Sequence, residues 1–282
     1  MNMREVGVSK IRDAVCELCL KANFELRKDV LKALRASLSK ETRPRPKNII
    51  RSIIENAKLA GKKRIAICQD TGMVVVHLEI GQDVALAGGS LKEAVNGGVE
   101  EAYRKGYLRK SVVDSPLARK NTNTNTPAII YTEIVNGDKV KVALSTKGFG
   151  SENKSMIKMF KPTESLESIK AFVLDVVKKA GPGACPPLVL GVGIGGTFDR
   201  AAYLAKKALL EPIDKKSPKR YLAKFERDLL RDINSLGIGP MGLGGRTTAL
   251  GVKVLEEATH IAGLPVAVNV SCHVTRSAEK II

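Results

Sequence analysis

Apolar residues recur at helical spacing over much of the chain, and this pattern predicts where helices form. Ser90 followed by Glu93 is a capping box, which marks the start of one helix, while Gly61 and Gly106 are natural helix C-caps. Because residues 1–60 are mostly helical in this pattern, we expect them to form a helical N-terminal part of the domain. The predicted helices cover residues 8–39, 48–59, 90–103, 164–180, 218–236 and 247–262.

Shorter apolar runs bounded by glycine, proline or polar residues predict strands. The pattern indicates a hairpin over residues 128–145, turning at Asn136-Gly137. No repeat and no linker interrupts the chain, so we expect residues 1–282 to form one α+β domain with a mainly antiparallel sheet. Further strands are predicted at residues 64–67, 73–80, 188–196 and 265–271.

Three single cysteines lie at the ends of predicted strands or in rigid loops. Cys68 opens a polar turn after a short apolar run, Cys185 stands between glycines and two prolines, and Cys272 follows the last predicted strand. Their wide separation suits a site assembled by the fold, and three thiolates can hold a metal or cluster with one position left open. A buried structural cysteine is the alternative for Cys68 taken alone. For the closely spaced pair at positions 16 and 19, on a predicted helix, core packing is the favoured role.

Composition narrows the classes of function. The net charge is +18, but aromatic residues make up only 4% of the chain and basic residues mostly alternate with acidic ones, which argues against nucleic-acid binding. No apolar run is long enough to span a membrane, and the N-terminus lacks a secretion signal. We therefore expect a cytoplasmic protein with reduced thiols and no membrane partner.

A glycine pattern offers a different class of function. Gly191, Gly193 and Gly196 match the dinucleotide fingerprint G-x-G-x-x-G, and Glu211 lies at a distance suited to gripping a ribose. Pro212, however, breaks the chain where the next strand of such a unit should begin. A dinucleotide-binding protein using Gly191–Gly196 is therefore a distant alternative.

Five motifs together carry a resemblance over nearly the whole chain. They are CQDTG at 68–72, the Asn-Thr-x-x-Asn-Thr-Pro loop at 121–127, KGFGSENKS at 147–155, GACPP at 183–187 and SCHVTR at 271–276. This set resembles the class I fumarase and L-tartrate dehydratase family of iron–sulfur hydro-lyases, and within it the alpha subunit of the two-subunit forms. The resemblance implies a [4Fe-4S] cluster held by Cys68, Cys185 and Cys272.

The same resemblance implies roles for other residues. Gln69, Arg109 and Gly150 would contact a small dicarboxylate substrate, and Asp70 would be catalytic. The expected reaction is the hydration of fumarate to (S)-malate, a step of the citric acid cycle, with L(+)-tartrate dehydration as the alternative. The family's catalytic base lies in a C-terminal part absent from this sequence, so we expect a separate beta subunit and a hetero-oligomer of two alpha and two beta chains.

Overall fold

The computed structural model describes residues 3–282, whose contacts group into two compact units. Unit 1 combines the segment up to Arg27 with Asn56–Phe149 and Arg276–Ile282, and unit 2 combines Lys28–Glu55 with Gly150–Thr275. Each unit therefore joins segments that are far apart in sequence. That the units act as the single domain expected from the sequence stays a prediction. No helix within residues 3–282 is long and apolar enough to cross a membrane.

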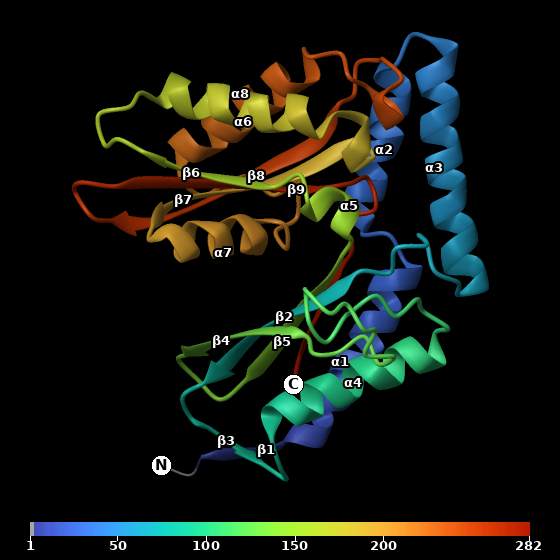
Figure 1. The fold of residues 1–282 in the computed structure, drawn as a ribbon, viewed down its shortest axis with the longest axis vertical. Helices are drawn as coiled ribbons and strands as arrows, with labels where there is room; N and C mark the ends of the chain where they lie inside the picture. The colour runs from blue at the N-terminus through green and yellow to red at the C-terminus, as the bar shows by residue number, and fades with distance from the viewer. Residues whose placement is uncertain (1–2) are drawn as a thin grey trace. The chain divides into compact units, whose positions relative to one another are not determined.

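In unit 1, two helices pack on a four-stranded mixed sheet, beside a small two-stranded ribbon (Figure 1). The sheet has the order β10-β5-β2-β4, in which β2 runs parallel to β4 and antiparallel to β5. The ribbon pairs β1 with β3 in parallel. The elements are β1 (Arg4–Gly7), α1 (Val8–Phe24), β2 (Met73–Gly81), β3 (Val84–Ala87), α4 (Leu91–Lys105), β4 (Ile129–Val135), β5 (Val140–Lys147) and β10 (Ser277–Ile281).

The hairpin predicted over residues 128–145 is wrong, because β2 lies between its two strands. The end of β2 enters the predicted turn: the amide of Gly81 donates to the carbonyl of Lys139 at 2.8 Å, and that of Gln82 to the carbonyl of Val135 at 2.7 Å. A Cβ at Gly81 would lie 2.1 Å from the carbonyl oxygen of Gly137, so only glycine fits there. The almost wholly buried β2 therefore lies between β4 and β5, which the turn residues alone had predicted to pair with each other.

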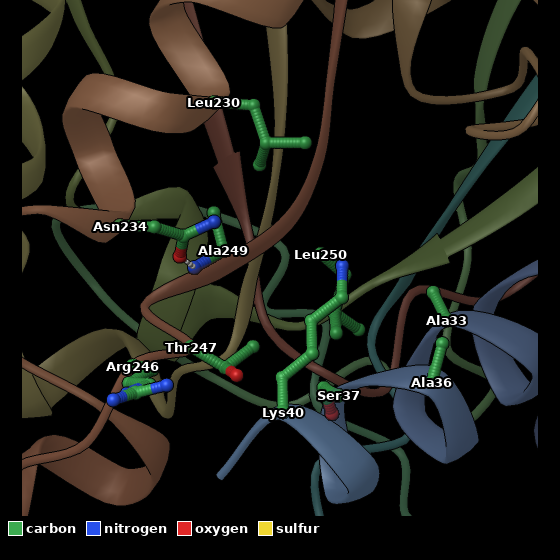
Figure 2. Close-up of a pocket in the computed structure, with 10 residues that line it drawn as sticks. All are labelled: Ala33, Ala36, Ser37, Lys40, Leu230, Asn234, Arg246, Thr247, Ala249 and Leu250. Atoms are coloured by element: carbon green, nitrogen blue, oxygen red, sulfur yellow. Dashed lines mark hydrogen bonds between the residues drawn. The ribbon is translucent and has the colours of Figure 1, made fainter.

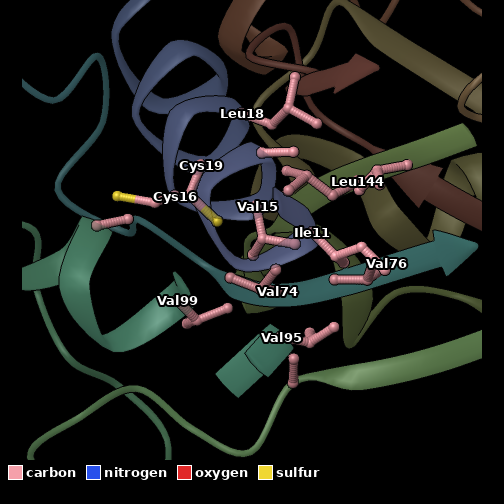
Figure 3. Packing of buried hydrophobic residues seen from close by; sticks show 14 of the residues in the cluster. Ile11, Val15, Cys16, Leu18, Cys19, Val74, Val76, Val95, Val99 and Leu144 are labelled. Carbon is pink, nitrogen blue, oxygen red and sulfur yellow. The ribbon is translucent and has the colours of Figure 1, made fainter. Parts of the chain in front are cut away.

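The core of unit 1 lies between α1, α4 and the sheet. Figure 3 shows Ile11 and Val15 of α1 facing Val74 and Val76 of β2, with Leu144 of β5 beside them. The two cysteines of α1, at positions 16 and 19, are 8% and 0% exposed and belong to this core. Burial raises the pKa of both thiols. The prediction that they serve packing is therefore confirmed.

Three predictions for the N-terminal third are wrong in detail. The helical pattern over residues 8–39 forms two helices, α1 and α2 (Lys28–Lys40), and α3 (Pro44–Lys63) includes Gly61 instead of ending there. The run at 64–67 is not a strand, since both main-chain groups of Ile67 are taken by helical residues. Its amide donates to the carbonyl of Asn23 at 2.9 Å, and its carbonyl accepts from the side chain of Asn56 at 2.9 Å.

Unit 2 has a second four-stranded sheet of order β6-β9-β7-β8 with helices on both faces (Figure 1). The short helix α5 (Phe149–Glu152) begins at Phe149, which belongs to unit 1, and its other residues belong to unit 2. The remaining elements of unit 2 are α2, β6 (Met156–Phe160), α6 (Leu166–Ala180), the 3-10 turn η1 (Gly181–Ala184), β7 (Leu188–Gly196), α7 (Phe198–Ala208), α8 (Arg220–Asn234), η2 (Pro240–Gly242), β8 (Ala249–Thr259) and β9 (Leu264–Ser271).

The two faces of β7 differ because its side chains alternate in size. Leu188, Leu190 and Val192 pack in the core under α6 and α8. Gly191 and Gly193 face α7, where a Cβ would lie 2.0 Å from the carbonyl oxygen of Ala205 and 2.1 Å from that of Ala201, respectively. These two glycines therefore serve close packing of a helix on a strand interior, and they do not form a phosphate-binding loop.

The predicted helix over residues 247–262 is a strand, β8, which pairs in parallel with β7. Its inward residues Val252 and Val254 are buried against α8, and this tertiary partner overrides the helical spacing. Within residues 3–282 four strand pairings are antiparallel and three are parallel. The predicted α+β class is confirmed, with sheets that are mixed.

Candidate functional site

The turn at residues 68–72 is anchored on the core of unit 1. The hydroxyl of Tyr103, a fully buried residue of α4, donates to the carbonyls of Thr71 at 2.7 Å and Gly72 at 2.9 Å. Gly72 has φ +79°, and a Cβ there would lie 2.7 Å from the carbonyl carbon of Thr146, so glycine is required. Burial raises the pKa of Tyr103, which keeps its hydroxyl protonated as the donor. The turn therefore presents Cys68, half-buried, from a fixed backbone.

The carboxylate of Asp70 is held by main-chain amides. The amide of Gly72 donates to Oδ1 at 3.0 Å, and the amide of Phe149 donates to Oδ2 at 2.8 Å. A Cβ at Gly148 would lie 3.0 Å from Oδ2 of Asp70 and 3.4 Å from a guanidinium nitrogen of Arg276. The glycine at position 148 thus leaves room for the carboxylate and the cation on the same side of the loop.

Arg109 is joined to the same turn through its backbone. Thr71, 1% exposed, donates from its hydroxyl to the carbonyl of Arg109 at 2.6 Å. Asn125 adds a second link: its side-chain amide donates to the carbonyl of Gly72 at 3.2 Å and accepts from the amide of Ser111 at 2.8 Å. The guanidinium of Arg109 is exposed, so its backbone is fixed while its charged end remains accessible.

Sequence reasoning assigned no role to two buried residues of this frame. Asn125 is 0% exposed with φ +62°, a conformation that asparagine tolerates better than most residues. Arg276 is 5% exposed; its Nη1 donates to Oδ1 of Asn23 at 3.2 Å, and its Nε lacks a hydrogen-bond partner within residues 3–282. Both belong to motifs noted in the sequence, at 121–127 and 271–276. The two motifs indicated that these segments belong to the site, but they did not indicate that the side chains of Asn125 and Arg276 are buried.

In unit 2, Cys185 and Cys272 are linked through His273. The main-chain amide of His273 donates to the carbonyl of Cys185 at 3.4 Å, and its Nδ1 lies 2.9 Å from the same oxygen. Burial lowers the pKa of His273 and favours the neutral ring, whose Nδ1 then donates to the carbonyl. Cys185 itself has φ +53° and precedes the cis peptide between Pro186 and Pro187. Both cysteines are half-buried.

Gly150 lies beside the loop that carries Cys185. A Cβ at Gly150 would lie 3.9 Å from the carbonyl oxygen of Gly183, and nothing nearer is found among the described atoms. The segment is fixed by Glu152, which pairs with Lys206 of α7 and accepts from the side chain of Asn269 at 2.9 Å. Because Asn269 is in β9, the strand that leads to Cys272, this network holds the Gly150 loop to the framework of the unit 2 cysteines.

The predicted site residues therefore fall into two groups. Unit 1 brings together Cys68, Gln69, Asp70 and Arg109, and unit 2 brings together Gly150, Cys185 and Cys272. None of the five cysteines forms a disulfide. Among residues 3–282 no cluster of three or more His, Cys, Asp or Glu side chains is arranged around a metal position.

Comparison with known proteins places the chain in a family. Residues 12–280 match the Fumerase family model, described as fumarate hydratase. The chain is 41% identical over 278 residues to the putative L(+)-tartrate dehydratase subunit alpha of Methanocaldococcus jannaschii, covering 96% of this chain and 97% of that one. It is 30% identical over 272 residues to the L(+)-tartrate dehydratase subunit alpha of Escherichia coli K12, covering 95% and 89%. The chain therefore belongs to the fumarate hydratase (Fumerase) family of hydro-lyases.

Proposed function

We propose that this chain is the alpha subunit of an iron–sulfur hydro-lyase that interconverts fumarate and (S)-malate. One observation carries the proposal: Asp70 and Arg109 belong to one hydrogen-bonded frame that also presents the Cys68 thiol. A carboxylate for proton exchange, a cation for a substrate carboxylate and a soft metal ligand are the groups that this chemistry needs. They come from a short turn and a neighbouring loop.

The donor set fits a [4Fe-4S] cluster held by Cys68, Cys185 and Cys272. Thiolate sulfur is the usual ligand of such clusters. The three thiols are half-buried, whereas the thiols at 16 and 19 are packed in the core and have raised pKa values. When bound, the cluster would supply an open iron as a Lewis acid for the hydroxyl or carboxylate of the substrate.

The residues of the chain would do the rest of the binding and proton handling. The planar guanidinium of Arg109 suits a bidentate pair with one substrate carboxylate. Gln69, exposed next to Cys68, and the backbone of Gly150 would contact the substrate by hydrogen bonds. Asp70, whose oxygens already accept from two amides, would exchange a proton with the leaving or entering water.

Removal of the carbon-bound proton needs a base, which we assign to a partner beta subunit. The relatives are named alpha subunits, and this chain spans nearly their whole length. We propose a hetero-oligomer of two alpha and two beta chains, active only when assembled. The excess of positive charge, +18, would favour an acidic partner.

L(+)-tartrate dehydration to oxaloacetate is the second candidate, since both relatives described above carry that activity in their names. The two substrates differ only in the groups on the two central carbons, so the same carboxylate-binding residues serve either reaction. Choice between them depends on contacts to those central carbons.

Co-expression with the cognate beta subunit tests the proposal. After anaerobic reconstitution with iron and sulfide, fumarate hydration and L(+)-tartrate dehydration are each measured by absorbance. We expect one of the two activities in the assembled enzyme and a loss of turnover in Asp70→Asn at unchanged iron content. Full turnover in Asp70→Asn, or in this chain without any partner, would contradict the assignment of roles.

A further inference from the structure

Unit 2 contains a cavity that none of the proposed catalytic residues lines. It has a volume of about 370 Å³ and lies between α2, the end of α8 and the segment 246–250 (Figure 2). This volume is within the usual range for small-molecule sites, roughly 300–1,000 Å³. The lining residues are Ala33, Ala36, Ser37, Lys40, Leu230, Asn234, Arg246, Thr247, Ala249 and Leu250.

The charges at this cavity are all positive. Lys40 and Arg246 line it, and no acidic residue does. Neither side chain forms an ion pair or hydrogen bond within the part of the chain that the structure describes. The neighbouring acid, Glu41, is 2% exposed and accepts from the main-chain amide of Arg246 at 2.9 and 3.0 Å, one bond to each oxygen. Because Glu41 is engaged with the backbone, both cations remain available to an anion.

The rest of the wall is apolar with a few hydroxyl groups. Ala33 and Ala36 come from α2, Leu230 from α8, and Ala249 from the start of β8. Figure 2 shows the Lys40 side chain extending from the end of α2 towards Leu250, with the Thr247 hydroxyl and Arg246 on the other side. The apolar part of the wall is suited to contact the carbon skeleton of a small ligand, and the two cations are suited to bind an acid group on the same ligand.

The frame of the cavity is rigid. The side chain of Asn234 accepts from the amides of Thr248 and Ala249 at 2.8 and 2.9 Å. The hydroxyl of Ser37 donates to the carbonyl of Leu34 at 2.7 Å, which fixes the orientation of this lining side chain on α2. The site is therefore largely formed before a ligand enters, which reduces the entropy lost on binding.

We propose that this cavity binds a small organic carboxylate, with Lys40 and Arg246 supplying the positive charge that attracts it and the alanine and leucine wall contacting its carbon skeleton. The site is separate from Asp70, Arg109 and the three proposed cluster cysteines. It does not depend on the catalytic role proposed for those residues. A carboxylate bound there is a candidate effector of the enzyme and not its substrate.

Calorimetric titration of the full-length chain with succinate and with inorganic phosphate tests the proposal. The double variant Lys40→Ala/Arg246→Ala removes both cations. The control Arg35→Ala/Lys224→Ala removes two exposed cations from α2 and α8, the helices that border the cavity, at positions that do not line it. Both double variants lose two positive charges. A difference in their succinate affinity therefore reflects the loss of cations at the cavity and not the change in the net charge of the protein. Circular dichroism checks that each variant is folded.

We expect succinate affinity to fall at least tenfold in the Lys40/Arg246 variant and to change less than twofold in the control. Ala36→Leu fills part of the cavity without changing its charge, and it should lower the affinity for succinate by a similar factor. Arg109→Ala should leave this binding unchanged, which separates it from any substrate binding. Equal losses in both double variants, no succinate binding at all, or tighter binding of phosphate than of succinate would overturn the proposal.

Discussion

The hydroxyl of Thr71 donates to the carbonyl oxygen of Arg109 over 2.6 Å, joining the turn that carries Cys68 to the loop that carries the exposed guanidinium. Thr71→Val keeps the shape of the side chain but leaves this carbonyl without its donor. We expect a loss of about 1–3 kcal/mol in the free energy of unfolding and a lower kcat/KM at unchanged iron content. Urea denaturation and steady-state kinetics measure the two effects. Thr71→Ser retains the donor and should recover most of both.

Arg109→Ala should lower kcat/KM of the assembled enzyme by roughly 10- to 150-fold, because hydrogen bonds to charged groups contribute about 1.5–3 kcal/mol. Lys110→Ala is a matched control, since this neighbouring cation is also exposed. The division of the loss between KM and kcat shows whether the contact forms in the ground state or only in the transition state. Unchanged kinetics would remove Arg109 from the site.

Serine at any one of Cys68, Cys185 or Cys272 should abolish cluster assembly, because each would supply one of three sulfur ligands. Serine at position 16, where the thiol is 8% exposed in the core of unit 1, should leave iron content unchanged. Iron and sulfide are measured after anaerobic reconstitution. Loss of iron from the position 16 variant, with iron retained in a Cys185 variant, would reverse the assignment.

Lys253 of β8 and Glu226 of α8 form a buried ion pair, with Nζ 3.0 Å from Oε1 and side chains 5% and 10% exposed. Lys253→Met would leave the carboxylate buried without its cation, and we expect a loss of about 3–5 kcal/mol in stability. Adding Glu226→Gln removes the uncompensated charge and still offers an acceptor to the amide of Val254. A double-mutant cycle in urea should therefore show the double variant to be more stable than Lys253→Met alone.

Gly193→Ala should destabilise unit 2 by about 1–3 kcal/mol. The added methyl would lie 2.1 Å from the carbonyl oxygen of Ala201 and 2.6 Å from the amide nitrogen of Ala205, so α7 would have to move away from β7. Gly263→Ala is the control, since its nearest neighbour would be 3.8 Å away. Equal melting temperatures for the two variants would contradict the packing role of Gly193.

Local chemistry in the sequence was informative where a few neighbouring residues decide the structure. The helix start predicted at Ser90 is correct, with the hydroxyl of Ser90 accepting from the amide of Glu93 at 3.4 Å. The turn at 68–72 is also where the sequence placed it, because Gly72 supplies a backbone conformation that few other residues adopt. The strand predicted to precede this turn does not form, since Ile67 finds its partners in Asn23 and Asn56, both distant in sequence.

Predictions failed where a distant segment supplies the partner. Residues 249–259 have helical spacing, yet β7 provides a parallel neighbour and α8 a cover, so they form a strand. The turn at Asn136-Gly137 looks sufficient for a hairpin, but β2 supplies a better partner for both flanking strands. For the site, the motifs identified Asp70 and Arg109. The supporting roles of Asn125 and Arg276 depend on burial, which no local pattern reveals.

The place of β10 beside β5 bears on how the protein is made. Unit 1 takes its sheet from strands that begin at Met73 and end at Ile281, so its last strand leaves the ribosome after all of unit 2. Until then one edge of β5 lacks its neighbour, and exposed strand edges are prone to pairing with other chains. During synthesis this edge is therefore open to such pairing until β10 docks on it.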